Sequence, residues 1–259
     1  MGLNEKIVTA VKKGDLALVR SLREEGADLF TTASDTSKKR TLLHHAAQRG
    51  HRELVCYLVS NNLNLDSLDQ DYKTPIYYAI EDSRLEIVKL LVELGASLNL
   101  VRNNPLYRAC ECSFAGPDIV EHLLKSGADF NLESDAGQTP LFGALNQQNT
   151  ESAGILLQLG ANPNHENLDG VTPLIAVAHQ KSPDHLEQLL KHEVNVNAIN
   201  RSTGETALHI AALYGRTENI SLLLDFGADK SLRNKKNETA LEIAERVGKV
   251  KPIKLLAGT

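Results

Sequence analysis

Residues 204–229 read GETALHIAALYGRTENISLLLDFGAD, and this stretch is the clearest copy of a unit that recurs along the chain. Thr206 offers a hydroxyl oxygen to the unpaired N–H groups of a starting helix, and Gly215 can take the positive φ that ends it. Ile220, Leu223 and Leu224 then give a second helix its apolar stripe, and Gly227 ends that helix. Neither short helix can bury its apolar side alone, so each pair has to pack against the next pair.

Seven further copies keep this register along the chain. At the position of Thr206, successive copies are separated by 36, 33, 30, 35, 33, 34 and 33 residues. In four copies a proline follows the capping position, where a missing N–H costs nothing. These prolines are Pro75, Pro105, Pro140 and Pro173. The positions equivalent to Thr206 are Glu5, Thr41, Thr74, Asn104, Thr139, Thr172 and Thr239.

The period and the motif at residues 206–212, followed by Gly-Ala-Asp at residues 227–229, resemble the ankyrin repeat. The resemblance covers essentially the whole chain. It implies an all-α solenoid of about eight helix-turn-helix units, which β-turn fingers join and two atypical caps close. We therefore expect residues 1–259 to form a single ankyrin-repeat domain.

Composition restricts the setting in which this chain works. No apolar run approaches the roughly 18 residues of a membrane span, and the first residues lack the pattern of a signal peptide. Cys56, Cys110 and Cys112 cannot build a disulfide framework and match no zinc spacing. The basic residues are not interleaved with aromatic ones, and the formal net charge is −5. We expect an intracellular, cytoplasmic protein that binds neither membrane nor nucleic acid.

The irregular spacings predict local departures from the repeat. Three extra residues enlarge the connection at residues 31–40, which we expect to project from the surface. Three missing residues shorten the connection at residues 98–103, which predicts a notch in the row of fingers. Two extra residues lie between the helices of the fourth unit at residues 112–117, where Phe114 is expected to be exposed.

The resemblance implies that partners bind to a concave surface formed by the finger tips and the exposed side of the first helices. Four of the six tyrosines fall in the third and fourth units, and tyrosine and arginine often anchor interfaces. We place the binding centre at Tyr72, Tyr77, Tyr78, Tyr107, Arg108 and Phe142, rimmed by Glu81, Asp82 and Glu111.

A second interpretation of these aromatic residues stays open. Tyr77, Tyr107 and Phe142 stand where the ankyrin signature has its half-buried histidine, so they can simply fill space. Tyr72 and Tyr78 stand at positions that vary freely in the pattern, and we expect both to be exposed.

A secondary basic surface surrounds the first finger. It could attract an acidic partner by long-range electrostatics, and the alternative is a solvated loop. Its residues are Lys38, Lys39, Arg40, Arg49, His51 and Arg52.

Catalytic patterns are weak in this sequence. His44 and His209 belong to the repeat signature, so we interpret them as structural, and Cys110 is expected in the core, away from His122. The chain contains neither a phosphate-binding glycine loop nor a His-Glu-x-x-His motif. We expect a non-enzymatic monomer without a cofactor that binds a protein partner as an adaptor or inhibitor. A bacterial effector acting in the host cytosol is one such role.

Two other functions remain as alternatives. The first is a small-ligand or catalytic site that uses the notch near Tyr107 and Arg108. The second is a structural spacer, which predicts that the aromatic cluster is buried.

Overall fold

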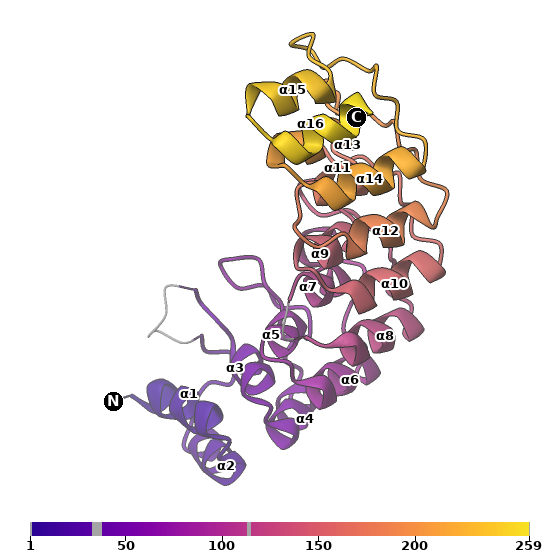
Figure 1. Ribbon diagram of the computed structural model, residues 1–259. Helices are drawn as coiled ribbons and strands as arrows, with labels where there is room; N and C mark the ends of the chain where they lie inside the picture. The colour runs from indigo at the N-terminus through magenta and orange to yellow at the C-terminus, as the bar shows by residue number, and fades with distance from the viewer. Residues whose placement is uncertain (1, 33–37, 113–114, 259) are drawn as a thin grey trace. The chain divides into compact units, whose positions relative to one another are not determined.

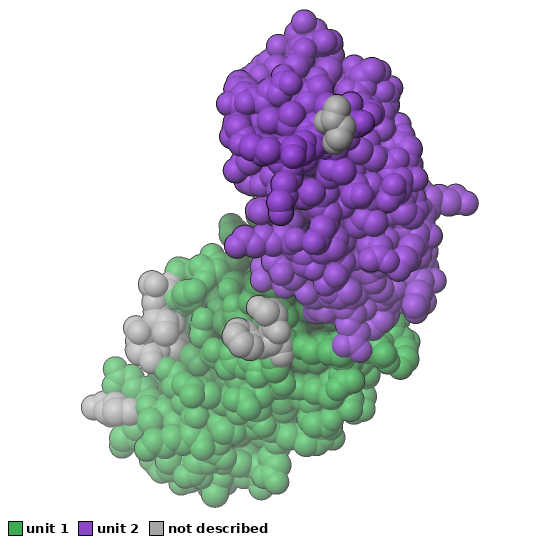
Figure 2. Space-filling model, viewed as in Figure 1, with its two compact units in different colours: residues 1–132 green, residues 133–259 purple. Residues whose placement is uncertain are grey.

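The computed structural model describes residues 2–32, 38–112 and 115–258. Phe114 and residues 33–37 of the enlarged connection lie outside these described residues. The chain divides into two compact units, residues 1–132 (unit 1) and residues 133–259 (unit 2), which Figure 2 colours separately. The single domain over residues 1–259 stays a prediction.

Unit 1 is a stack of helix pairs, as the repeat predicts. The first helices α1, α3, α5 and α7 pack on one another in order, and α4, α6 and α8 form a second row (Figure 1). A single 3-10 turn, η1, occupies the shortened connection before α7. The bounds are α1 Leu3–Lys13, α2 Leu16–Glu24, α3 Leu42–Arg49, α4 Arg52–Ser60, α5 Pro75–Glu81, α6 Leu85–Glu93, η1 Val101–Asn103, α7 Pro105–Glu111 and α8 Pro117–Lys125.

Unit 2 repeats the same arrangement. Its first helices α9, α11, α13 and α15 pack in order, and α10 packs on α12 and α14 on α16. In the described stretches of both units the regular elements are all helical, apart from one isolated bridge between Thr32 and Thr41. The predicted all-α fold is therefore confirmed. The bounds are α9 Pro140–Asn146, α10 Thr150–Gln158, α11 Pro173–Val177, α12 Asp184–Leu190, α13 Ala207–Tyr214, α14 Thr217–Asp225, α15 Ala240–Arg246 and α16 Val250–Ala257.

The helix ends follow the sequence signals. Each of the four predicted prolines is the first residue of its helix, and Pro117 likewise begins α8. Gly215 ends α13 with φ +70°, and Asn62 takes φ +65° where other units have glycine. The first unit differs, because α1 begins at Leu3, with Gly2 and not Glu5 as its N-cap. The Glu5 carboxylate accepts the Gly2 N–H at 3.1 Å, which caps this earlier helix start.

The signature histidines tie each first helix to the finger that follows. His209 Nδ1 accepts the Thr206 N–H at 3.2 Å, so the ring proton sits on Nε2, which donates to the Glu238 carbonyl at 3.1 Å. His44 makes the same two contacts, and burial lowers the pKa of both rings. These neutral histidines are structural, as predicted.

Candidate partner-binding site

The finger of residues 69–73 is built around a buried carboxylate. Asp69 Oδ1 accepts the backbone N–H groups of Asp71 and Lys73 at 2.8 and 3.0 Å. Its Oδ2 accepts the Tyr78 hydroxyl at 2.6 Å and lies 3.8 Å from Arg40 Nε. The Asp69 side chain is fully buried, so these donors replace its lost hydration. The finger is therefore anchored to α5.

Tyr78 is not exposed, and this corrects the prediction. Its exposed fraction is 1%, and the Arg40 guanidinium lies 3.9 Å from the centre of its ring. Burial and the hydrogen bond to Asp69 raise the pKa of the Tyr78 hydroxyl, which keeps it protonated as a donor. The side chain faces the base of its own finger, where Asp69 provides an acceptor. Tyr78 therefore supports the finger from within and is not exposed at the surface.

Tyr77 and Arg108 form a charged, half-buried group on α5 and α7. The Lys73 ammonium lies 4.5 Å and the Arg108 guanidinium 5.1 Å from the centre of the Tyr77 ring. Glu81 Oε1 accepts from both cations, at 3.5 Å from Lys73 Nζ and 3.0 Å from Arg108 Nη2. A second carboxylate, Glu111, binds Arg108 Nη1 at 3.2 Å. These contacts hold the ring and the guanidinium in place before any partner binds.

Tyr72 stands at the tip of the same finger and is 54% exposed, as predicted for this residue. Its backbone is left-handed, with φ +58°. The Arg102 guanidinium lies 5.2 Å from the centre of the Tyr72 ring, and Asn103 Nδ2 donates to the Tyr72 carbonyl. The shortened connection therefore supplies both neighbours of this exposed ring.

Regular fingers in unit 2 have glycine at the position of Tyr72. Leu168 N–H donates to the Ala136 carbonyl at 3.2 Å, and a Cβ on Gly137 would lie 2.9 Å from that same nitrogen. Beside Tyr72, the side-chain amide of Asn103 donates instead to the carbonyl of Tyr72 itself. The shorter connection thus replaces a backbone contact with a side-chain contact.

The remaining predicted residues are divided between the two units. Tyr107 is half-buried on α7, and Asp82 is exposed at the end of α5. Phe142 belongs to unit 2, is 1% exposed and packs edge-on against His165 at 6.4 Å. Its burial contradicts the prediction that it contacts a partner, because the aromatic ring fills the site of the signature histidine in the core.

The predicted secondary basic surface separates into two groups. Lys38 pairs with Asp71 at 2.5 Å, and Arg40 is bound to Asp69, so both belong to the finger network. Lys39 is exposed between them. Arg49 lies at the other end of the eight-residue helix α3, about 12 Å along its axis, and Arg52 begins α4.

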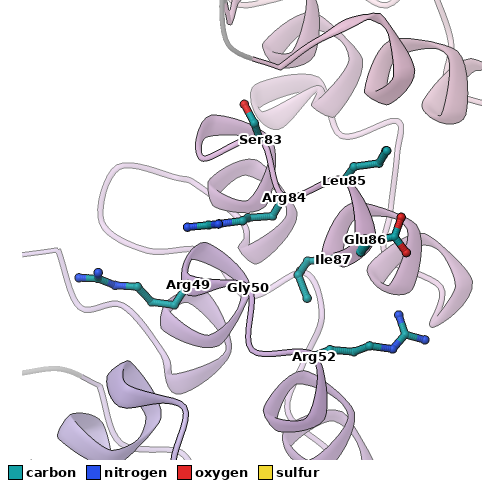
Figure 3. Close-up of a pocket in the computed structure, with 8 residues that line it drawn as sticks. All are labelled: Arg49, Gly50, Arg52, Ser83, Arg84, Leu85, Glu86 and Ile87. Atoms are coloured by element: carbon teal, nitrogen blue, oxygen red, sulfur yellow. The ribbon is translucent and has the colours of Figure 1, made fainter.

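Arg49 and Arg52 line a surface hollow of about 410 Å³ in unit 1 (Figure 3). The third arginine of the hollow, Arg84, was not singled out from the sequence. Arg84 directly precedes α6, at a position where a residue that accepts a capping hydrogen bond is normally found, and that unusual position could have indicated it. The remaining lining residues are Gly50, Ser83, Leu85, Glu86 and Ile87.

An exposed aromatic residue of unit 2 was also missed. Tyr214 is 49% exposed at the end of α13, with the His179 ring 5.7 Å and the Arg216 guanidinium 5.9 Å from its ring centre. Its signal was the position directly before the helix-ending Gly215.

Two kinds of catalytic group are considered for the described part of the chain, a reactive thiol and a metal-binding cluster. Burial raises the pKa of the Cys110 thiol, so it stays protonated and is a poor nucleophile. No group of three or more His, Cys, Asp or Glu side chains among the described residues could hold a metal ion. Among those residues, too, every helix is too short or too polar to cross a membrane.

Comparison with known proteins supports the repeat assignment. The chain matches the family described as ankyrin repeats (3 copies) over residues 7–102, 106–200 and 174–259. It belongs to the ankyrin-repeat family. Ankyrin repeats are in general protein-interaction modules, and the match indicates no catalytic family.

Similar proteins include a human protein and a plant protein. The chain is 33% identical over 116 residues to human ankyrin repeat and SOCS box protein 11, covering 44% of this chain and 35% of that protein. It is 30% identical over 160 residues to the E3 ubiquitin-protein ligase KEG of Arabidopsis thaliana, covering 60% and 9%. The chain therefore spans about a third or less of the length of these relatives.

A solved ankyrin structure confirms the fold. The crystal structure of the human ASB11 ankyrin repeat domain superposes with a TM-score of 0.73 at 25% identity. The superposition covers 86% of this chain and 98% of that domain.

Proposed function

We propose that this chain is a non-catalytic scaffold that binds a protein partner through one surface of unit 1, which we call the finger face. The finger face consists of the tip residues 69–73 and the solvent-facing side chains of α5 and α7. Tyr72, Tyr77 and Arg108 form its centre. An inhibitor blocks its partner and an adaptor recruits it, and either role needs only binding at this surface.

The backbone of Tyr72 carries this proposal. In equivalent fingers the left-handed position is held by Gly137, Gly170, Gly204 and Asn237, which tolerate it, and by the exposed Lys39. A bulky L-residue pays about 1–2 kcal/mol for this conformation. Because the Tyr72 ring is also half in solvent, neither backbone preference nor burial accounts for a tyrosine here. Strained, exposed aromatic residues concentrate at sites of function.

Tyr77 and Arg108 support the same assignment by their pre-organisation. The guanidinium is held by Glu81 and Glu111, and the ring by two cations. Side chains that are already ordered lose less entropy when a partner binds, so each contact yields more affinity. Tyrosine and arginine are also the types most enriched among residues that dominate binding energy.

The intracellular, cytoplasmic location is part of this proposal. It rests on the cysteines, because Cys56, Cys110 and Cys112 are all free thiols, as is usual in a reducing compartment.

The test compares two matched tyrosine substitutions. Tyr72→Asn places the residue found at position 237 into the strained finger tip, while Tyr214→Asn removes an equally exposed tyrosine from unit 2. A partner captured by the intact chain and identified by mass spectrometry is then titrated against each variant. We expect Tyr72→Asn to weaken binding at least about 30-fold, the effect of a dominant interface residue, without lowering thermal stability. Equal affinity of the Tyr72→Asn and intact chains would refute the finger face.

A further inference from the structure

Three arginines line the hollow between the α3–α4 and α5–α6 turns: Arg49, Arg52 and Arg84. Other arginines of this chain have carboxylate partners, namely Arg40, Arg108, Arg201, Arg233 and Arg246. Within the described residues, the side chains of Arg49 and Arg52 form neither a hydrogen bond nor an ion pair. Unpaired guanidinium groups at one hollow leave a local excess of positive charge.

Arg84 is fixed in position at this hollow. Its Nε donates to the Gln48 carbonyl at 3.3 Å, and its stem passes over Gly50, where an added Cβ would lie 3.4 Å from Arg84 Cδ. The terminal nitrogens of the guanidinium extend beyond this contact. Figure 3 shows that Arg49 and Arg84 extend toward the same side, so two cations border one stretch of surface.

The carboxylate of the hollow does not balance these cations. Glu86 is the single acid among the lining residues, and it accepts from Lys89 Nζ at 2.9 Å, which lowers the pKa of its carboxyl. Figure 3 places Glu86 with Arg52, on the side away from Arg49 and Arg84. The pair formed by Arg49 and Arg84 is therefore left without a facing anion in the lining.

The helix that begins at the hollow adds to the imbalance. Arg84 is the N-cap of α6 and provides no acceptor, whereas the equivalent Asp15 of α2 and Asn149 of α10 accept a first-turn N–H. A cation at the positive end of a helix dipole is unfavourable, and an anion there is favourable. The helix end alone would not define a site, but it acts in the same direction as the unpaired arginines.

We propose that this arginine hollow binds the phosphate group of a phosphorylated segment on a protein partner. Two guanidinium groups can donate charge-assisted hydrogen bonds to the oxygens of a phosphate dianion. The hydroxyl of an unphosphorylated side chain is neutral and accepts weaker hydrogen bonds. A volume of about 410 Å³ has room for the phosphate together with the side chain that carries it, and Leu85 offers apolar contact. The hollow shares none of its lining residues with the finger face.

The experiment titrates the isotope-labelled chain with N-acetyl-phosphoserine amide and follows the backbone amides by NMR at constant ionic strength. The comparison ligands are N-acetyl-serine amide and inorganic phosphate. We expect saturable shifts of residues 49–53 and 83–87 with phosphoserine and none with serine. Arg49→Gln and Arg84→Gln should each weaken binding about five-fold, and Glu86→Gln should strengthen it.

Arg23→Gln serves as the matched control, because Arg23 is exposed on α2 and is not part of the hollow. Unchanged phosphoserine affinity in this variant supports the site, and equal weakening in Arg23→Gln and Arg84→Gln would overturn it as unspecific charge. An absence of saturable shifts would also overturn it. Inorganic phosphate binding as tightly as phosphoserine would overturn the peptide assignment. Loss of binding in Arg49→Gln, whose side chain has no hydrogen bond to lose, separates recognition from misfolding.

Discussion

Replacing Tyr78 by phenylalanine removes one oxygen atom from the base of the finger and leaves the ring in place. Asp69 Oδ2 then loses its hydrogen bond of 2.6 Å and keeps only Arg40 Nε at 3.8 Å. A hydrogen bond to a charged group contributes about 1.5–3 kcal/mol, and the Asp69 side chain stays buried without a replacement by water. Because the stacked Arg40 and the ring packing are retained, we expect local destabilisation of about 2–3 kcal/mol.

The assay is native-state hydrogen exchange at the Asp71 and Lys73 amides, which donate to Asp69 Oδ1. Repeat proteins do not unfold in a single step, so a local probe measures this change better than one melting temperature. A loss of 2–3 kcal/mol corresponds to roughly 30- to 140-fold faster exchange, at about 1.4 kcal/mol per factor of ten.

The control for this prediction is Tyr72→Phe, which removes a hydroxyl from the exposed ring of the same finger. Its exchange rates should match those of the intact chain. If exchange in Tyr78→Phe accelerates less than about five-fold, the Tyr78 hydroxyl does not hold the finger and the buried Asp69 carboxylate does not depend on it.

Two further predictions concern histidines and glycines. Burial lowers the pKa of His44 and His209 from 6.5, so on acidification the unfolded chain binds protons at a higher pH than the folded chain does. The free energy of unfolding measured in urea should therefore fall as the pH drops below about 6.5. The double substitution His44→Gln and His209→Gln should weaken this pH dependence, and an unchanged slope would contradict the neutral-histidine assignment. Gly204→Ala should lower the free energy of unfolding in urea by at least about 1 kcal/mol more than Gly227→Ala does. Both glycines have positive φ, but only a Cβ at residue 204 would lie 2.8 Å from a backbone nitrogen, that of Lys235. Equal losses would show that the fingers are not closely packed there.

The regular parts of the fold could be predicted because their causes are local. Proline at a first helical position and glycine at a helix end act within one turn of chain, so Pro75 and Gly215 marked real boundaries. The early start of α1 was missed because the side chain of Glu5 caps it from inside the helix. The start of this helix was predicted by aligning the first unit with the other units, and that alignment does not include the contact between Glu5 and Gly2.

The candidate site could be predicted only in part. Tyr72 was expected to be exposed and is, but Tyr78 is buried because its partner Asp69 lies nine residues earlier and closes over it only when the finger folds back. The grouping of Arg49 with Arg40 relied on closeness in sequence. A helix of eight residues separates them in space and brings Arg49 to Arg84 instead.

The sequence by itself therefore determined the repeat, its helix boundaries and the residue types available at the surface, since periodicity and capping act over a few residues. Only the tertiary structure decided which tyrosine is buried, which arginines are paired and where the unpaired ones meet. Two of those outcomes depend on side chains about 30 to 40 residues apart, Arg40 with Tyr78 and Arg49 with Arg84, which the stacking of successive repeats brings together. Burial of the Asp69 carboxylate, for example, removes its hydration, and donors that the folded finger supplies, Tyr78 among them, replace it.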